Sequence, residues 1–359
     1  MIKAATTESS SLVNPARHYD IDWLRTLALA LLIIYHVAIS FQPWAIYVGF
    51  IQNEQPLEFL WPLMSAINIW RIPILFFISG MGLYFAAQRR NWKELLGDRS
   101  LRILVPFIFG YFCIGPINAF FISKLYTGKT IYAPGAWHLW FLLNIFIYVL
   151  LLLPLVLYVK RQPNHILFRW LARLFRMPLG IFLLAIAIIL EAVLLNPQEF
   201  PRYAQTAHGF WLGFVCFFLG FMVVSVGDDF WEAVKRQRLL SLILAFGLYL
   251  LRMTWLANHT PNWLIAIESM AWMLAMIGLA ANYLNKPSVA LKYLSAAVYP
   301  VYIVHMPVQY ALSFYITPLE LSALLKLFIL LIGVFAGSFL LYEMLKRLRW
   351  IRPLFGMKW

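Results

Sequence analysis

The sequence predicts an all-α integral membrane protein, a polytopic bundle of about ten transmembrane helices. Of its 359 residues, 63% are hydrophobic and only 12% are charged, whereas soluble domains carry about 25% charged residues. A water-soluble domain of this size cannot bury so much apolar surface, which excludes an ordinary soluble enzyme, a disordered chain and a disulfide scaffold. The spans are expected to be helical because lipid offers no hydrogen bonds, so each backbone amide must be bonded within its own segment.

Ten apolar runs, each bounded by charge, proline or glycine, are long enough to cross a bilayer core of about 30 Å. A polar segment at residues 1–20, expected to be cytoplasmic, precedes them, and a basic cytoplasmic tail at residues 347–359 follows them. We therefore expect a single membrane domain over residues 21–346. The predicted spans are Trp23–Phe41, Ile69–Ala87, Ile103–Ile122, Leu139–Tyr158, Leu179–Leu195, Phe210–Val226, Leu239–Leu256, Trp263–Ala281, Ser295–Ile316 and Leu324–Leu345.

The basic residues are distributed so as to fix the orientation of these spans. Of the 29 lysines and arginines, 22 lie before the first span, after the second, fourth, sixth and eighth spans, and in the tail. Only five lie in the segments between, and positive residues concentrate on the cytoplasmic side of membrane proteins. Both termini are therefore predicted to be cytoplasmic, which requires an even number of spans. The net charge of +14 is then a topology signal and not a nucleic-acid footprint, and some of it can also meet anionic lipid headgroups or a phosphorylated ligand.

Two ionisable residues on the first span are the leading candidates for a functional site. Arg25 and His36 are eleven residues apart, close to three helical turns, so both project from nearly the same face about 16 Å apart. Asp22, three residues before Arg25, is placed to pair with it. Separately, Arg25 could reach lipid headgroups and His36 could be a packed histidine, but a charge inside a span costs about 2.5–3.5 kcal/mol on insertion scales. The pair therefore favours a polar path running inward from the cytoplasmic side.

Three more arginines are candidates for binding a substrate. Arg71 lies toward the outer end of the second span, where it either serves the site or anchors the membrane interface beside Trp70. Arg99 and Arg102 flank the inner start of the third span on one helical face. Arginine forks suit phosphate and diphosphate groups, although both residues also fit the cytoplasmic positive charge that topology requires.

The remaining embedded candidates are two carboxylates and two histidines. Glu191 and Glu268 could each accept a proton or pair with Arg71 or Arg252, and the sequence does not distinguish these roles. His138 opens the fourth span and His305 lies in the ninth; each could line a polar cavity or be packed.

Several signatures of other functions are missing from the sequence. It has no phosphate-binding GxxxxGK[ST] loop, no HExxH and no paired Cys and His at metal-ligand spacing. We therefore expect no ATP-driven pump, no metal and no tightly bound cofactor. The chemistry must come from embedded histidine, arginine and glutamate side chains.

Five short stretches resemble the motifs of the family-3 membrane acyltransferases. Arg25, ten residues and His36 are similar to the family's Arg-x10-His motif. The stretches PILFFISG (73–80), RSLRILVP (99–106), HLWFL (138–142) and YIVHMP (302–307) are similar to its PLFFxISG, RxxRLxxP, HLWFL and IYLLHxP motifs, in the same order. The nearest resemblance is to the branch that modifies glucans, which includes a periplasmic glucan succinyltransferase.

The resemblance implies a fold of roughly ten spans in the bacterial inner membrane and an activity that O-acylates extracytoplasmic sugars or glycans. It implies acyl-CoA as the donor co-substrate on the cytoplasmic side, with a sugar or glycan as acceptor. His36 is then expected to be the catalytic base or a transiently acylated nucleophile, with Arg25 as its catalytic partner and Asp22 as structural support. The residues expected to bind substrate are Arg71, Arg99, Arg102, His138, Glu268 and His305.

Two points stay open at this stage. No hydrolase-like soluble domain follows the last predicted span, so acyl delivery is expected at the membrane domain itself or on another protein. A proton-coupled transporter or exporter of a glycolipid or small molecule is the alternative, because ten spans with embedded His, Glu and Arg also fit transport. Dependence on a thioester donor distinguishes the two.

Overall fold

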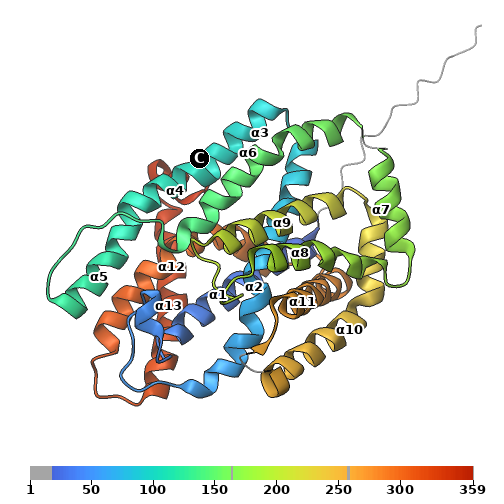
Figure 1. The fold of residues 1–359 in the computed structure, drawn as a ribbon. Helices are drawn as coiled ribbons and strands as arrows, with labels where there is room; N and C mark the ends of the chain where they lie inside the picture. Colours follow the sequence, from blue (N-terminus) through green and yellow to red (C-terminus); the bar gives the residue numbers. More distant parts are fainter. Residues whose placement is uncertain (1–17, 163–164, 257–258, 359) are drawn as a thin grey trace, which may run out of the picture.

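The structure is a computed structural model that describes residues 18–162, 165–256 and 259–358, and over these residues it contains helices and no strands. The predicted all-α fold is thus confirmed (Figure 1). The helices are α1 (Tyr19–Ile39), α2 (Trp61–Gln88), α3 (Trp92–Arg99), α4 (Val105–Phe109), α5 (Gly115–Thr127), α6 (Trp140–Arg161), α7 (Ile166–Arg176), α8 (Ala185–Leu195), α9 (Ala207–Val224), α10 (Asp228–Leu251), α11 (Asn262–Tyr283), α12 (Val289–Ile316) and α13 (Ala323–Leu345).

Nine helical segments in the described part of the chain are long and apolar enough to cross a membrane. They account for nine of the ten predicted spans, and the fifth corresponds to a shorter apolar helix at Gly180–Leu195. A helix of this length rises only about 24 Å, less than the core of a typical bilayer. The prediction of about ten spans is thus confirmed for nine long spans, and the fifth is present as this shorter helix.

This short segment nevertheless runs from one end of the bundle to the other. Just before it, Arg176 Nε donates to Asp229 Oδ1 at the start of α10 (2.8 Å). Just after it, Asn262 Nδ2 at the start of α11 donates to the Asn196 side chain (3.1 Å). Because α10 and α11 are antiparallel neighbours joined in sequence, their starts lie at opposite ends of the bundle. Over the described residues, the nine long segments and this shorter one therefore pass between the two ends.

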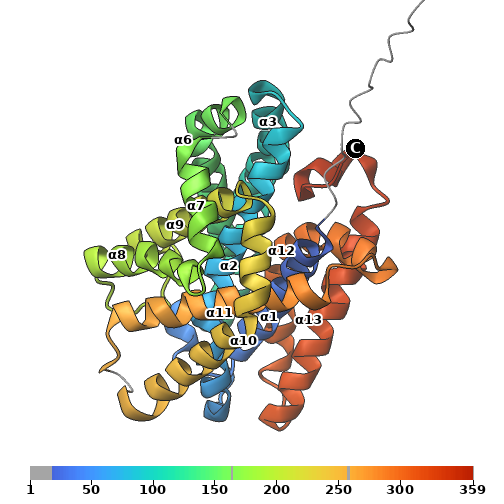
Figure 2. The ribbon, with the colours of Figure 1, turned by 90° about the vertical axis from the view of Figure 1, so that its right-hand side faces the viewer.

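The two ends of the described chain lie on the same side of the bundle (Figure 2). The backbone N–H of Tyr19 donates to Asn285 Oδ1 (3.0 Å) in the turn after α11. The predicted cytoplasmic segment falls largely on residues 1–17, including Lys3 and Arg17, which lie outside the described residues. The predicted tail is not a free extension: residues Arg349–Phe355 form a 3₁₀ turn, in which Arg352 Nε donates to the Lys346 carbonyl (2.8 Å).

Several helices begin before the predicted spans, as α2 does at Trp61 and not at Ile69. Helix α10 begins eleven residues before the predicted span, because a helix can continue into water past the end of its apolar run. The third span is a composite of α3, α4 and α5 over Trp92–Thr127. Two π-helical turns interrupt it, at Ser100–Leu104 and Gly110–Ile114. Such turns change the direction in which the following side chains point and are frequent at functional sites.

Helices α1 and α2 lie inside the bundle: α1 packs against α2, α11, α12 and α13, and α2 also packs against α6 and α9 (Figure 1). Glycine allows the closest of these approaches. A Cβ on Gly80 would lie 1.9 Å from the Phe217 carbonyl oxygen, and a Cβ on Gly220 would lie 1.9 Å from the Phe77 carbonyl oxygen. Small residues at such crossings let two membrane helices pack backbone to backbone.

Proline inside α2 creates a polar point in this apolar core. Pro73 has no N–H, so the carbonyl of Ile69, four residues earlier, loses its helical partner. The hydroxyls of Tyr203 (3.1 Å) and Ser269 (2.8 Å) donate to that carbonyl instead. The proline thereby ties α2 to α11 and to the segment before α9.

Candidate active site

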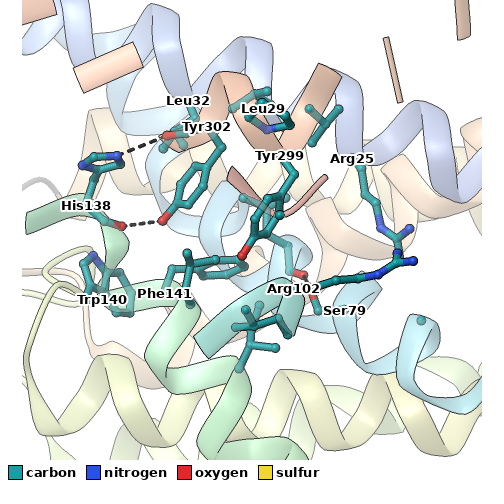
Figure 3. Close-up of a pocket in the computed structure, with 18 of the residues that line it drawn as sticks. Arg25, Leu29, Leu32, Ser79, Arg102, His138, Trp140, Phe141, Tyr299 and Tyr302 are labelled. Carbon is teal, nitrogen blue, oxygen red and sulfur yellow. Dashed lines mark hydrogen bonds between the residues drawn. The ribbon is translucent and has the colours of Figure 1, made fainter. Parts of the chain in front are cut away.

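A cavity of about 1720 Å³ runs through the bundle between α1, α2, the third span, α6, α12 and the tail. Arg25 and Arg102 lie at one end of the part drawn in Figure 3 and His138 lies at the other, with Tyr299 and Tyr302 between them. Arg25 and His36 both line this cavity, so the shared face predicted from their spacing is confirmed.

A hydrogen-bond chain behind His36 fixes which of its ring nitrogens carries the proton. His305 Nδ1 lies 2.7 Å from the Tyr302 carbonyl oxygen. A carbonyl only accepts, so this nitrogen is protonated, and in the neutral ring Nε2 is then an acceptor. His36 Nδ1 lies 3.0 Å from His305 Nε2 and must be the donor. The lone pair of a neutral His36 is therefore on Nε2.

The Nε2 atom of His36 has no hydrogen-bond partner among the residues that the structure describes, and His36 is half-buried at the cavity wall. His305 is fully buried behind it, and the two rings are nearly parallel with centroids 5.3 Å apart. Gln309 Nε2 donates to the His36 carbonyl (2.7 Å) and so holds α12 against α1 at this level. His36 therefore presents its basic Nε2 to the cavity, while its Nδ1 is held by the hydrogen bond to His305.

Proline in α12 explains how His138 joins this group. Pro307 removes the helical partner of the Ile303 carbonyl, four residues earlier. His138 Nε2 lies 3.2 Å from that carbonyl oxygen and 3.1 Å from that of Tyr302. Both oxygens accept, so His138 is protonated on Nε2. The Tyr302 carbonyl thus orients two histidines, whose ring centroids are 5.0 Å apart.

At the inner end of the cavity, two polar contacts hold Arg25. Its Nη1 lies 3.7 Å from Asp22 Oδ1, the pairing that the sequence predicts, and its Nη2 donates to the Ile78 carbonyl (3.4 Å). Gly82 gives the guanidinium room, because a Cβ there would lie 2.6 Å from Nη2. The side chain remains 37% exposed, so it is held in place yet open to a ligand.

Further cations surround the same inner end. Arg99 Nη2 donates to the Gly82 carbonyl (3.3 Å), and Arg102 Nε lies 3.0 Å from Asp98 Oδ1. Arg102 lies within the first π-helical turn of the third span. Lys346, at the end of α13, and Arg352 and Lys358 of the tail also line this part of the cavity. This cluster has far more positive than negative charge and is suited to a ligand with several phosphates.

Three predicted substrate-binding residues do not line the cavity: His305 is buried behind His36, and the other two lie elsewhere. Arg71 does not line the cavity; it is 1% exposed, its guanidinium lies 3.8 Å from the centroid of the Tyr35 ring, and it donates to Asn68 Oδ1 (3.3 Å). Glu268 forms a buried two-point ion pair with Arg252, with Nε–Oε2 and Nη2–Oε1 distances of 2.6 and 3.0 Å. Arg71 and Glu268 thus contact other protein side chains and do not reach the cavity wall.

The other embedded carboxylate is also paired away from the cavity. Glu191 Oε1 lies 2.8 Å from Nδ1 of His208, whose Nε2 lies 3.0 Å from the Phe200 carbonyl. Within the described residues no group of three His, Cys, Asp or Glu is arranged to hold a metal ion.

Two features of the site were not predicted from the sequence: the direct contact of His36 with His305, and the residues that the tail contributes to the inner end of the cavity. The histidines are 269 residues apart, so no local pattern connects them. One signal was present: Pro307, two residues after His305, marks a free carbonyl in the same helical turn.

Similarity to known proteins shows the family to which the chain belongs. A family model described as an acyltransferase domain, that of acyltransferase family 3, matches residues 18–343. The chain is 25% identical to "Glucans biosynthesis protein C" of Salmonella paratyphi B, of Salmonella enteritidis and of Salmonella paratyphi A, over alignments that cover 97% of this chain and 97% of each relative. No solved structure matches the chain. Since the family model spans most of the sequence, this multi-pass membrane protein belongs to acyltransferase family 3 and is a membrane acyltransferase.

Proposed function

We propose that the protein transfers an acyl group, of the acetyl or succinyl type, from cytoplasmic acyl-CoA to a hydroxyl of an extracytoplasmic glycan at the bacterial inner membrane. The observation that carries the proposal is the Nε2 lone pair of His36, placed at the wall of a cavity whose inner end is strongly basic. The name of the Salmonella relatives supports a glucan as the acceptor.

In the proposed reaction, His36 Nε2 takes the proton of an acceptor hydroxyl as that oxygen attacks the thioester carbonyl carbon. The new C–O bond forms, the C–S bond breaks, and the imidazolium returns the proton to the departing CoA thiolate. His305 stabilises the imidazolium because its Nε2 accepts from His36 Nδ1 (3.0 Å), which is the role of the third member of a catalytic triad.

The donor reaches this nitrogen from the basic end. Arg25, Arg99 and Arg102 bind the CoA phosphates, and the eleven residues between Arg25 and His36 correspond to about 16 Å along α1. The pantetheine arm spans this distance along the cavity and brings the thioester to His36. Acceptor and donor thus meet at one nitrogen from opposite sides of the membrane.

A second form of the mechanism makes His36 a nucleophile that is transiently acylated. Incubating purified protein with labelled acyl-CoA in the absence of acceptor distinguishes the two forms. A stable adduct on His36, located by peptide mass spectrometry, excludes the simple base mechanism.

The test of the function uses sealed proteoliposomes with acyl-CoA on one side and a linear glucose oligosaccharide on the other. We expect acylated oligosaccharide and one equivalent of free CoA thiol, and no product when both substrates are on the acceptor side. Movement of oligosaccharide across the membrane without thioester consumption would instead establish a transporter.

A further inference from the structure

The cavity continues beyond His36 toward the loops at the end opposite the termini. We define this part as the outer vestibule, lined by Val48, Phe50, Trp137, Ala204, Gln205 and Tyr310. Its residues come from the loop after α1, the turn before α6, the loop before α9, and α12. Four segments far apart in sequence therefore converge on one opening.

A row of aromatic rings leads from the outer vestibule to the catalytic imidazole. Trp137 meets Tyr310 edge to face (centroids 5.7 Å apart), Tyr310 stacks near Phe50 (5.9 Å), and Phe50 lies 5.5 Å from the ring of His36. The Tyr310 hydroxyl donates to the Gly49 carbonyl (2.7 Å), which holds the row in position. The row therefore connects Trp137 with the ring of His36 through Tyr310 and Phe50.

Trp137 is held in an unusual backbone conformation. Its φ is +44°, in the left-handed region that bulky residues rarely adopt. A Cβ on Gly115 would lie 2.9 Å from its Cδ1, and a Cβ on Gly135 would lie 3.2 Å from its Nε1, so two glycines make room for the indole. Gln205, the other positive-φ residue in the vestibule (φ +57°), is exposed. Such strained positions gather at binding sites.

The charge of the outer vestibule limits what it can bind. Among the residues that the structure describes, every lysine, arginine, aspartate and glutamate of the cavity wall lies toward the inner end. A carboxylate or phosphate entering the vestibule would lose hydration without gaining a charged partner. An indole ring and an amide side chain on the wall of one cavity suit a ligand with an apolar C–H face and a rim of hydroxyls.

From this arrangement we infer that the outer vestibule is a subsite for an uncharged pyranose ring that stacks on Trp137, hydrogen-bonds Gln205 and presents a hydroxyl to His36. The inference rests on the proposed function for the identity of that hydroxyl as the acceptor. It adds that the acceptor is a neutral sugar at the point of transfer and that Trp137 sets the affinity for it.

Binding and kinetics test the subsite separately. Equilibrium dialysis of the full-length protein, without acyl-CoA, compares a linear glucose pentasaccharide with the same pentasaccharide oxidised to carboxylates at C6. We expect the neutral probe to bind at least tenfold more tightly, and Trp137→Ala to weaken it about tenfold. Trp137→Phe retains an aromatic face, so its affinity for the neutral probe should lie between those of the wild type and Trp137→Ala. The matched control is Trp255→Ala, because Trp255 is exposed and lies outside the cavity.

In steady-state transfer assays, Trp137→Ala should raise KM for the pentasaccharide about tenfold while KM for acyl-CoA changes less than twofold. Equal affinity for both probes, binding of neither, or unchanged neutral binding in Trp137→Ala would each overturn the subsite. Trp137-dependent binding without any acyl transfer would leave the subsite standing and reject the proposed function. Acyl transfer with an unchanged KM for the pentasaccharide in Trp137→Ala would support the proposed function and reject the subsite.

Discussion

Replacing His305 with phenylalanine removes the support of His36 without touching the cavity wall. His305 Nε2 accepts from His36 Nδ1 at 3.0 Å, and His305 is fully buried. Once His36 is protonated, this becomes a hydrogen bond to a charged group, worth about 1.5–3 kcal/mol. At 1.36 kcal/mol for each factor of ten, kcat should fall about 10- to 150-fold. The phenyl ring keeps most of the packing against His36.

The assay measures acyl transfer by purified protein at saturating acyl-CoA, with the unfolding temperature recorded for each variant. KM for acyl-CoA should stay within twofold, because His305 does not line the cavity. His305→Gln, whose Oε1 can still accept from His36, should lose less activity than His305→Phe. A folded His305→Phe variant with kcat within twofold of wild type would refute the proposed role of the histidine pair.

Three further predictions concern the helix contacts and the inner end of the cavity. In Gly82→Ala the new Cβ would lie 2.6 Å from Arg25 Nη2, so we expect KM for acyl-CoA to rise about fivefold because the charged contact of Arg25 with the ligand is displaced. The control is Gly97→Ala, whose Cβ would meet nothing within 4 Å; equal kinetics in both variants would contradict the placement of Arg25. In Gly80→Ala the Cβ would lie 1.9 Å from the Phe217 carbonyl oxygen, so the free energy of unfolding should drop by about 1–3 kcal/mol. The control is Gly247→Ala, whose Cβ would point into open space; an unfolding midpoint as high as that of the control would argue against the close α2–α9 contact. Glu268→Gln should destabilise the protein by about 3–5 kcal/mol because the buried Arg252 loses its carboxylate partner, and the double variant Arg252→Met with Glu268→Leu should lose less stability. A raised KM for a substrate with unchanged stability in Glu268→Gln would instead indicate that Glu268 binds substrate.

Hydropathy predicted most of the fold because lipid leaves the backbone few choices. The shared face of Arg25 and His36 also followed from helical geometry alone, since the two residues belong to one regular helix. Hydropathy was less informative where a helix leaves the apolar region: α10 extends eleven residues beyond its predicted start. The shortness of the fifth span was visible in the sequence, because the predicted range Leu179–Leu195 nearly coincides with the observed helical segment Gly180–Leu195.

The parts of the site that depend on contacts between distant segments were beyond the sequence. The sequence left Glu268 with Arg71 or Arg252 as possible partners, and only the packing of α10 against α11 selects Arg252. His36 and His305 come together because α1 packs against α12. The π-helical turn that carries Arg102 has no simple sequence signature, although prolines four residues after a free carbonyl, as at Pro307, are readable in advance.

The most direct test of the central claim is the rate of acyl transfer from labelled acyl-CoA to a glucose oligosaccharide by purified His36→Ala. His165→Asn is the matched control, because His165 lies at the start of α7, where asparagine keeps the capping acceptor for the Leu167 N–H. We predict that His36→Ala is folded, retains the wild-type affinity for acyl-CoA and transfers no measurable acyl group, while His165→Asn remains as active as wild type. Full transfer by His36→Ala would contradict the assignment of His36 as the reacting group.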